Sequence, residues 1–249
     1  MTGRWLTGPD RDGGRPLVVV VPPGSTGPEL LSGWPAALPD ADVSVVQLPG
    51  RGARLFETPA TSITDLADEL ADHLVSVVPD RWVLAGHCSG SYLALETAHR
   101  AVAAGRSPLR LVVSGSRPPY GLADPHSEES AAAAELLALT DGELKRRLGL
   151  DESTVDDEVV AAVLAAHRAA GAAAAGYRHR HEPVDIEVEV WRGADDDVVS
   201  ERDARGWHAY ALTAPTHAVF AGHREYFEQP RPAAVDRVAR VLGTARGTQ

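Results

Sequence analysis

The feature that most constrains the fold of this chain is a short turn, Gly86-His87-Cys88-Ser89-Gly90, between an apolar run and a helical pattern. The apolar run, residues 82–85, predicts a strand that enters the turn, and residues 91–98 predict a helix that leaves it. A strand–turn–helix of this kind holds a nucleophile on a strained backbone, and its two glycines let the strand and the helix approach each other. The free N–H groups of the turn and the positive end of the helix favour the thiolate form of Cys88.

Cys88 is the only cysteine in the chain. It therefore forms no internal disulfide and has no cysteine partner for a metal site. Most free cysteines are small core residues, but the strand and helix that flank Cys88 favour a catalytic role.

Apolar, β-branched runs alternate with helical patterns along most of the chain. The predicted strands are residues 17–21, 43–47, 82–85, 109–113, 186–191 and 217–220, and the predicted helices include residues 29–38, 64–78, 91–98, 200–210 and 235–242. Strands that are apolar on both faces are typical of a mainly parallel sheet covered by helices on each side. The sequence therefore predicts an α/β fold.

The alternation stops between residues 117 and 183, where the pattern predicts helices but no strand. These helices are expected at residues 130–139, 141–148 and 155–177, and Thr140 followed by Glu143 is a capping-box pattern. We interpret the segment as a helical lid inserted over the active site; the alternative is a helical connection that only packs on the sheet. The predicted organisation is an N-terminal extension (1–15), a core (16–116 and 184–249) and a lid (117–183).

The charge balance narrows the expected partners. The chain has 24 Lys+Arg against 35 Asp+Glu, a formal net charge of −11, which argues against nucleic acid or an anionic membrane as the main partner. No apolar run approaches the length of a bilayer span, and the polar first 15 residues contain no secretory signal. With a single reduced cysteine, these observations predict a cytoplasmic protein.

A cysteine nucleophile needs a base, and the base needs an acceptor that orients it. With this kind of turn, the acid and then the histidine follow late strands of the sheet. Three aspartates follow the strand at 186–191, and Asp196 is our choice, with Asp195 and Asp197 as alternatives. A charged turn before the next helix explains any one of the three equally well. His223, at the end of the last predicted strand, is the predicted base.

The chain has ten histidines, and most are poor candidates for the base. Several lie in a predicted strand or helix or adjoin the nucleophile: His87, His99, His208 and His217. His179 and His181 form an H-x-H pair without a third ligand at suitable spacing, so we predict no metal site.

Four stretches together resemble one known family. They are residues 22–34, the segment Gln47-Leu48-Pro49-Gly50-Arg51-Gly52-Ala53-Arg54-Leu55, the turn at 86–90, and residues 196–207 with Gly222-His223. Over residues 16–242 the chain resembles the stand-alone type II thioesterases of polyketide and nonribosomal peptide assembly lines, which are α/β-hydrolases with a helical lid.

Three positions depart from this resemblance. Cys88 stands where the family has serine, the first loop lacks an Ala-Gly-Gly run, and Ala221 and Arg224 flank the histidine where the family more often has glycine and an aromatic residue.

The resemblance implies a set of catalytic roles. Cys88 would be the nucleophile, Asp196 the orienting acid and His223 the base, and the backbone N–H groups of Gly24 and Ser89 would form the oxyanion hole. Arg224 would bind a carboxylate or polar acyl group if it points into the pocket. Its alternative role is that of a surface arginine paired with Glu225 or Glu228.

The resemblance also implies the substrate class, which is acyl groups on the phosphopantetheine arm of acyl or peptidyl carrier proteins. We expect a monomer without a cofactor of its own that hydrolyses these thioesters. Because an acyl group on cysteine is itself a thioester, transfer to a second carrier or to an amine is the first alternative. The others are a non-catalytic carrier-binding partner and a hydrolase that cleaves esters or carbon–carbon bonds on the same fold.

Overall fold

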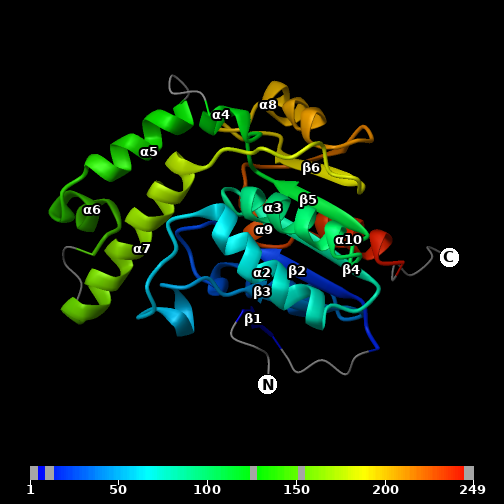
Figure 1. Cartoon of the computed structure of the whole chain (residues 1–249), viewed down its shortest axis with the longest axis horizontal. Helices are drawn as coiled ribbons and strands as arrows, with labels where there is room; N and C mark the ends of the chain where they lie inside the picture. Colours follow the sequence, from blue (N-terminus) through cyan, green and yellow to red (C-terminus); the bar gives the residue numbers. More distant parts are fainter. Residues whose placement is uncertain (1–4, 9–13, 124–127, 151–154, 244–249) are drawn as a thin grey trace.

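The computed structural model describes residues 5–8, 14–123, 128–150 and 155–243. Seven strands form one sheet in the order β1-β3-β2-β4-β5-β6-β7 (Figure 1). The strands are β1 Leu6–Thr7, β2 Leu17–Val21, β3 Asp42–Val46, β4 Trp82–His87, β5 Arg110–Ser114, β6 Val188–Gly193 and β7 Thr216–Phe220. Every pair is parallel except β1 with β3, so the predicted α/β fold with a mainly parallel sheet is confirmed.

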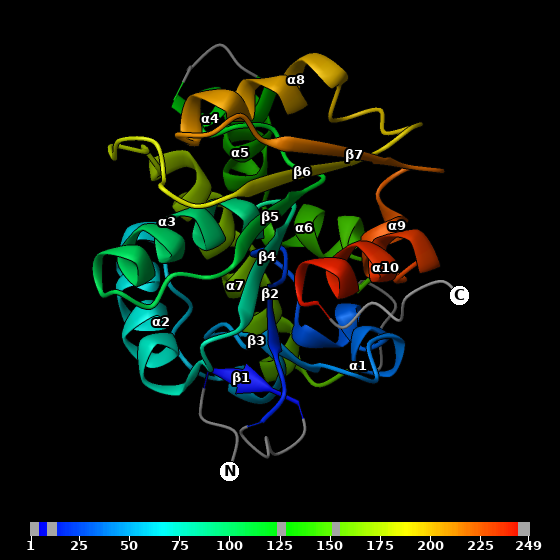
Figure 2. The same ribbon diagram turned by 90° about the vertical axis from the view of Figure 1, so that its right-hand side faces the viewer.

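Helices cover both faces of the sheet, as Figure 2 shows. Residues of α2 (Ile63–Val77), α3 (Gly90–Ala103) and α8 (Glu201–Gly206) share one apolar core with alternate residues of β2 and β4. On the other face, α1 (Trp34–Ala37), α9 (Glu225–Glu228) and α10 (Pro232–Val241) pack in a second core. Strand β2 is buried throughout, because its side chains supply both cores.

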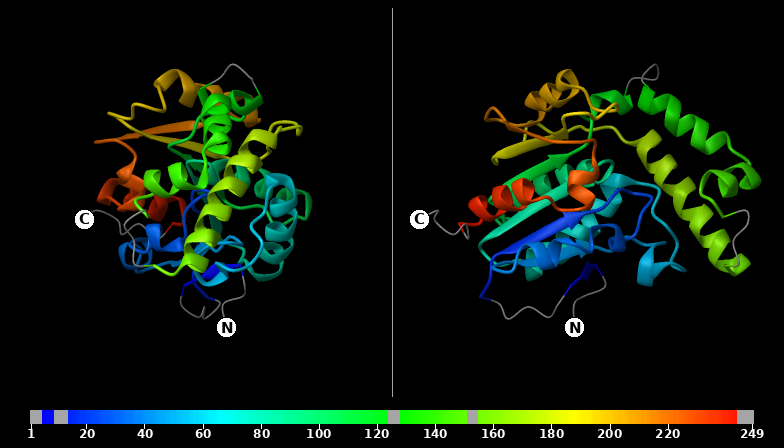
Figure 3. Two further views of the ribbon diagram at one scale, coloured as in Figure 1. Left: turned by 90° about the vertical axis from the view of Figure 1, so that its left-hand side faces the viewer. Right: turned by 180° about the vertical axis from the view of Figure 1, so that it is seen from behind.

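The segment between β5 and β6 forms helices and no strand within its described residues. The helices are α4 Tyr120–Ala123, α5 Glu128–Ala138, α6 Asp141–Arg147 and α7 Asp157–Gly176. Thr140 and Glu143 form the predicted capping box at the start of α6. Figures 1 and 3 show α5, α6 and α7 as an arm at one end of the sheet.

Two local predictions were wrong. Residues 29–38 form a 3₁₀ helix, Pro28–Leu31, and the separate helix α1, because Pro35 can stand in the first turn of a helix but not in its interior. The expected N-terminal extension also contributes to the core: Leu6 and Thr7 pair with β3, and Trp5 is buried.

Helix α7 corrects the expectation that no apolar segment has the length of a membrane span. Its 20 residues include an 18-residue window with a mean hydropathy of 1.4, which meets that criterion by length and composition. Alanine supplies much of this hydropathy. In the structure α7 packs on α5, and its Val160 and Leu164 form a small core with Leu144 of α6.

Candidate active site

Cys88 occupies the turn between β4 and α3 in a strained conformation. Its φ of 51° makes it the only residue other than glycine with a positive φ in the described part of the chain. A left-handed conformation costs a side-chain-bearing residue about 1–3 kcal/mol and persists only where the surroundings hold it. The Cys88 N–H donates to the carbonyl oxygen of Ser114, 2.8 Å away, which extends the β4–β5 pairing into the turn.

The two glycines of the turn are required by close contacts between backbones. A Cβ atom on Gly86 would lie 2.6 Å from the carbonyl oxygen of Gly90, and one on Gly90 would lie 2.4 Å from the carbonyl oxygen of Pro22. The Ser91 hydroxyl donates to the Gly86 carbonyl oxygen at 3.0 Å and ties the first turn of α3 to the end of β4. The strand–turn–helix predicted from the sequence is therefore present.

His87 is buried beside Cys88 and packs in the core. Its ring is stacked on Phe227 with centroids 4.7 Å apart. Its Nδ1 lies 3.0 Å from the hydroxyl of Ser114, which in turn contacts the Tyr226 hydroxyl. Burial lowers the pKa of His87 to about 3, and the nearby Arg224 cation acts in the same direction. His87 is therefore neutral near pH 7.

The structure distinguishes Asp196 from its two neighbours by burial. The Asp196 side chain is fully buried, whereas Asp195 and Asp197 are exposed. Its Oδ1 accepts the backbone N–H groups of Val198 at 2.9 Å and Val199 at 3.0 Å. Its Oδ2 is buried and has no hydrogen-bond partner. A buried, unpaired carboxylate oxygen costs free energy unless another donor reaches it, so Oδ2 is the acceptor that an orienting acid must offer.

His223 follows β7 in a loop that is joined to the loop carrying Asp196. The Asp195 N–H donates to the Gly222 carbonyl oxygen at 3.1 Å. At Gly193 a Cβ atom would lie 2.0 Å from the carbonyl oxygen of His223, so only glycine fits at the end of β6. The sheet thus brings both loops to the same edge. The side chain of His223 is exposed and makes no hydrogen bond to Asp196 or Cys88 in this conformation.

Arg224 contacts the acid. Its Nη2 lies 3.6 Å from Oδ1 of Asp196, and 29% of its side chain is exposed. This contact with Asp196 was not among the roles expected for Arg224 from the sequence.

The two residues predicted for the oxyanion hole are in direct contact. The Gly24 N–H donates to the Ser89 hydroxyl at 2.8 Å. A Cβ atom on Gly24 would be 3.7 Å from that of Ala170 in α7, so the helical insertion passes close to Gly24. Ser89 caps the start of α3, next to the strained Cys88.

A small apolar pocket adjoins these donors. Its volume is about 50 Å³, and Gly24, Ser89, Leu93 and Ala170 contribute to its lining. Arg51, which is only 7% exposed, also lines it. The Arg51 guanidinium donates to the carbonyl oxygens of Pro49 and of Ala166 in α7, both at 2.7 Å, so it connects the core to the insertion. Burial lowers the pKa of Arg51 to about 10.

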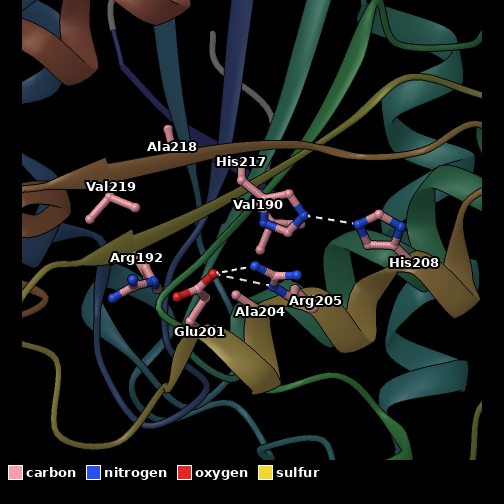
Figure 4. Close-up of a pocket in the computed structure, with 9 residues that line it drawn as sticks. All are labelled: Val190, Arg192, Glu201, Ala204, Arg205, His208, His217, Ala218 and Val219. Atoms are coloured by element: carbon pink, nitrogen blue, oxygen red, sulfur yellow. Dashed lines mark hydrogen bonds and ion pairs between the residues drawn. The ribbon is translucent and has the colours of Figure 1, made fainter.

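Four other histidines make contacts away from Cys88 and Asp196. Figure 4 shows His208 and His217 in an open groove of about 630 Å³ whose lining contains none of the predicted site residues. Their Nε2 atoms lie 3.1 Å apart, and the rings are stacked. His179 and His181 both bind the buried carboxylate of Glu96. Among the described residues, no group of three metal-ligating side chains is arranged to hold a metal ion.

Sequence reasoning missed three features of this site. They are the Ser89 hydroxyl on the Gly24 N–H, the contact of Arg224 with Asp196, and the bridge from Arg51 to α7. Arg51 lies in the stretch at residues 47–55 that resembles the type II thioesterases. This resemblance marks Arg51 as a position of interest, but it does not indicate which group Arg51 binds.

The fold and the turn place the chain in the α/β-hydrolase class, with Cys88 after the central strand β4, Asp196 after β6 and His223 after β7. The thioesterase-domain family matches residues 16–244, and the chain belongs to that family.

Similar proteins cover different shares of the chain. A probable cadicidin biosynthesis thioesterase from Streptomyces griseus is 27% identical over 211 residues, 82% of this chain and 56% of the relative. The chain spans about half the length of the curated relatives it matches. The type II thioesterase BorB from the borrelidin biosynthetic cluster is 27% identical with a TM-score of 0.82, over 98% of this chain and 99% of BorB. RedJ, a thioesterase from the prodiginine pathway in Streptomyces coelicolor, is 27% identical with a TM-score of 0.70, over 93% of this chain and 90% of RedJ.

Proposed function

We propose that this protein is a type II thioesterase that hydrolyses acyl groups from the phosphopantetheine arm of carrier proteins in a polyketide or nonribosomal peptide pathway. The observation that carries the proposal is the strained backbone of Cys88 (φ 51°) at the elbow between β4 and α3. Relatives named as thioesterases of biosynthetic clusters support the substrate class. We further propose that it acts as a cytoplasmic monomer without a cofactor of its own.

In the first half-reaction the Cys88 thiolate attacks the carbonyl carbon of the acyl thioester. The backbone N–H groups of Gly24 and Ser89 stabilise the oxyanion, and a donor of this kind is worth on the order of 10²–10³ in rate. The Ser89 hydroxyl that now accepts the Gly24 N–H gives up this position to the substrate oxygen. The oxyanion then collapses, the bond to the pantetheine sulfur breaks, and His223 protonates the leaving thiolate.

In the second half-reaction His223 removes a proton from water, which attacks the acyl-Cys88 thioester. Collapse of the second oxyanion releases the carboxylic acid and the Cys88 thiolate. For both steps the His223 ring turns inward so that one nitrogen faces Cys88 and the other donates to Oδ2 of Asp196, the buried oxygen without a partner.

The sulfur nucleophile favours a second candidate function, transfer of the acyl group to another carrier thiol or to an amine. Acyl-Cys88 and the pantetheine thioester are nearly equal in energy, so return of the acyl group to a thiol meets no thermodynamic barrier. An oxygen ester on serine would lie below the thioester and resist attack by a thiol.

Intact-mass spectrometry separates the candidates. The protein is mixed with propionyl-pantetheine, and we expect a mass increase of one propionyl group that is absent in Cys88→Ala. Decay of the adduct in buffer alone supports hydrolysis, whereas decay that requires added pantetheine thiol or an amine supports transfer. An adduct that persists in Cys88→Ala would overturn the assignment of the nucleophile, and no adduct and no turnover would favour the non-catalytic carrier-binding alternative.

A further inference from the structure

A polar cleft adjoins the small pocket beside the nucleophile. The cleft has a volume of about 470 Å³ and lies between the first turn of α2 and the segment that leaves α7. Ile63 of α2 and Ala173 of α7 line both the cleft and the apolar pocket, so the two spaces are neighbours. Gly24 and Ser89 line this apolar pocket, so the cleft lies next to the space that these two residues border.

The floor of the cleft is a carboxylate whose oxygens already accept several hydrogen bonds. Glu96 is fully buried and accepts hydrogen bonds from Tyr177, His179, His181 and Arg100, at distances of 2.7–3.1 Å. Burial raises its pKa, but the bonds from His179, Arg100 and Tyr177 outweigh burial and lower it to about 2. Arg100 also pairs with Asp68. Arg100 and the oxygens of Glu96 are therefore already engaged with groups of the protein.

The rim of the cleft differs from its floor. Arg178 and Arg180 line it, and both are exposed. One Nη of Arg178 donates to the carbonyl oxygens of Ala175 and Tyr177, and no carboxylate pairs with either guanidinium among the described residues. In a chain with a formal net charge of −11, two neighbouring arginines without acidic partners mark a site for an anion.

We propose that this cleft binds the phosphopantetheine arm of the carrier protein, with the phosphate held by Arg178 and Arg180. The inference rests on the proposed function and adds the route by which the phosphopantetheine arm would reach the site. The charge of the rim fits a phosphate, since guanidinium groups bind phosphate oxygens through paired N–H donors. The polar cleft fits the amides of the pantetheine, and the neighbouring apolar pocket fits a short acyl group.

Two small substrates that differ only in the phosphate test the proposal. Propionyl-phosphopantetheine and propionyl-pantetheine are compared with wild type and with the double variant Arg178→Glu/Arg180→Glu. We expect the variant to raise KM for the phosphorylated substrate about tenfold or more, since at least one charge-assisted bond is lost. Values of kcat for both substrates, and KM for propionyl-pantetheine, should stay within about twofold of wild type, as for other surface changes.

A matched control carries the same change in charge elsewhere. Arg146→Glu/Arg202→Glu alters two exposed arginines that do not line the cleft, and it should leave KM for the phosphorylated substrate unchanged. Because Arg178 also caps the end of α7, the single variant Arg180→Glu is measured beside the pair and should show part of the effect. Equal KM values for the two substrates with wild type, or an equal rise for both with the variant, would overturn the proposal.

A binding measurement keeps this inference separate from the proposed reaction. Phosphopantetheine and pantetheine are titrated into Cys88→Ala by calorimetry, with no turnover required. Tighter binding of phosphopantetheine that is lost in the arginine variant supports the cleft even if wild type hydrolyses neither thioester. Hydrolysis of both thioesters without any preference for the phosphate would retain the proposed function and reject the cleft.

Discussion

Replacement of Asp196 by asparagine tests the proposed triad sharply, because the structure dictates how the new amide would sit. Oδ1 accepts two backbone N–H groups, from Val198 and Val199, while Oδ2 is buried without a partner. An asparagine keeps both bonds only if its oxygen takes the place of Oδ1. Its NH₂ group then occupies the position of Oδ2 and presents donors where the triad needs an acceptor.

The effect on rate should far exceed the effect on stability. Without the acceptor, the working tautomer and the imidazolium of His223 are both disfavoured, and we expect kcat to fall by up to about 10⁴-fold. The two backbone bonds change from charge-assisted, about 1.5–3 kcal/mol each, to neutral, about 0.5–1.5 kcal/mol each. The free energy of unfolding should therefore fall by only about 2–3 kcal/mol.

Steady-state thioester hydrolysis and urea unfolding measure the two effects. Asp195→Asn and Asp197→Asn are the matched controls, since both side chains are exposed and should change kcat by no more than about twofold. Asp196→Ala removes the acceptor of both backbone N–H groups and should be less stable than Asp196→Asn. Equal losses of activity at the three positions, or the largest loss at a control position, would refute the assignment of Asp196.

Three further predictions concern the elbow and its neighbour His87. Cys88→Ala and Cys88→Gly should both lack turnover, and glycine should be more stable by about 1 kcal/mol because it adopts a φ of 51° without strain; equal melting temperatures would show that the turn is relaxed. Gly90→Ala, whose Cβ would lie 2.4 Å from the Pro22 carbonyl oxygen, should lower the unfolding free energy by more than about 3 kcal/mol, and wild-type behaviour in denaturant would contradict the close approach. The pKa of buried His87, about 3, lies below its ordinary value of 6.5, so the folded state binds fewer protons, and stability should fall as the pH drops from 6.5 towards 3. The slope is about 1.4 kcal/mol per pH unit at most, and His87→Gln should flatten it in pH-dependent unfolding; an unchanged slope would assign the loss to other groups.

The elements that depend on consecutive residues could be predicted from the sequence. The elbow was predictable because small residues, a strand and a helix are consecutive in the sequence, and the same holds for the capping box of α6. Strand β1 has two residues, too few for any periodicity, and it exists only because β3 offers it an edge. The predicted helix at 29–38 is divided into two short helices, because Pro35 is tolerated in the first turn of α1 but not inside a longer helix.

The site was less predictable because burial and long-range contacts select its members. Three consecutive aspartates are equivalent in the sequence, and only the fold buries Asp196. The bridge from Arg51 to Ala166 spans 115 positions, and the contact of Gly24 with Ser89 spans 65. No pattern of residues signals such contacts, because each depends on where the sheet and the insertion bring distant loops together.

The contact between Gly24 and Ser89 indicates how the proposed oxyanion hole would keep its donor paired before substrate binds. The Gly24 N–H group is partly buried, and such a donor without a partner costs up to about 1–3 kcal/mol. The Ser89 hydroxyl supplies one at 2.8 Å, from a side chain that can rotate away about a single bond. A substrate carbonyl oxygen then replaces one acceptor with another, and the gain in hydrogen bonding appears only when that oxygen becomes negatively charged. Binding of the uncharged substrate would therefore change the hydrogen-bond free energy at the Gly24 N–H very little. The stronger bond to the negatively charged oxygen would form in the transition state and lower the activation barrier.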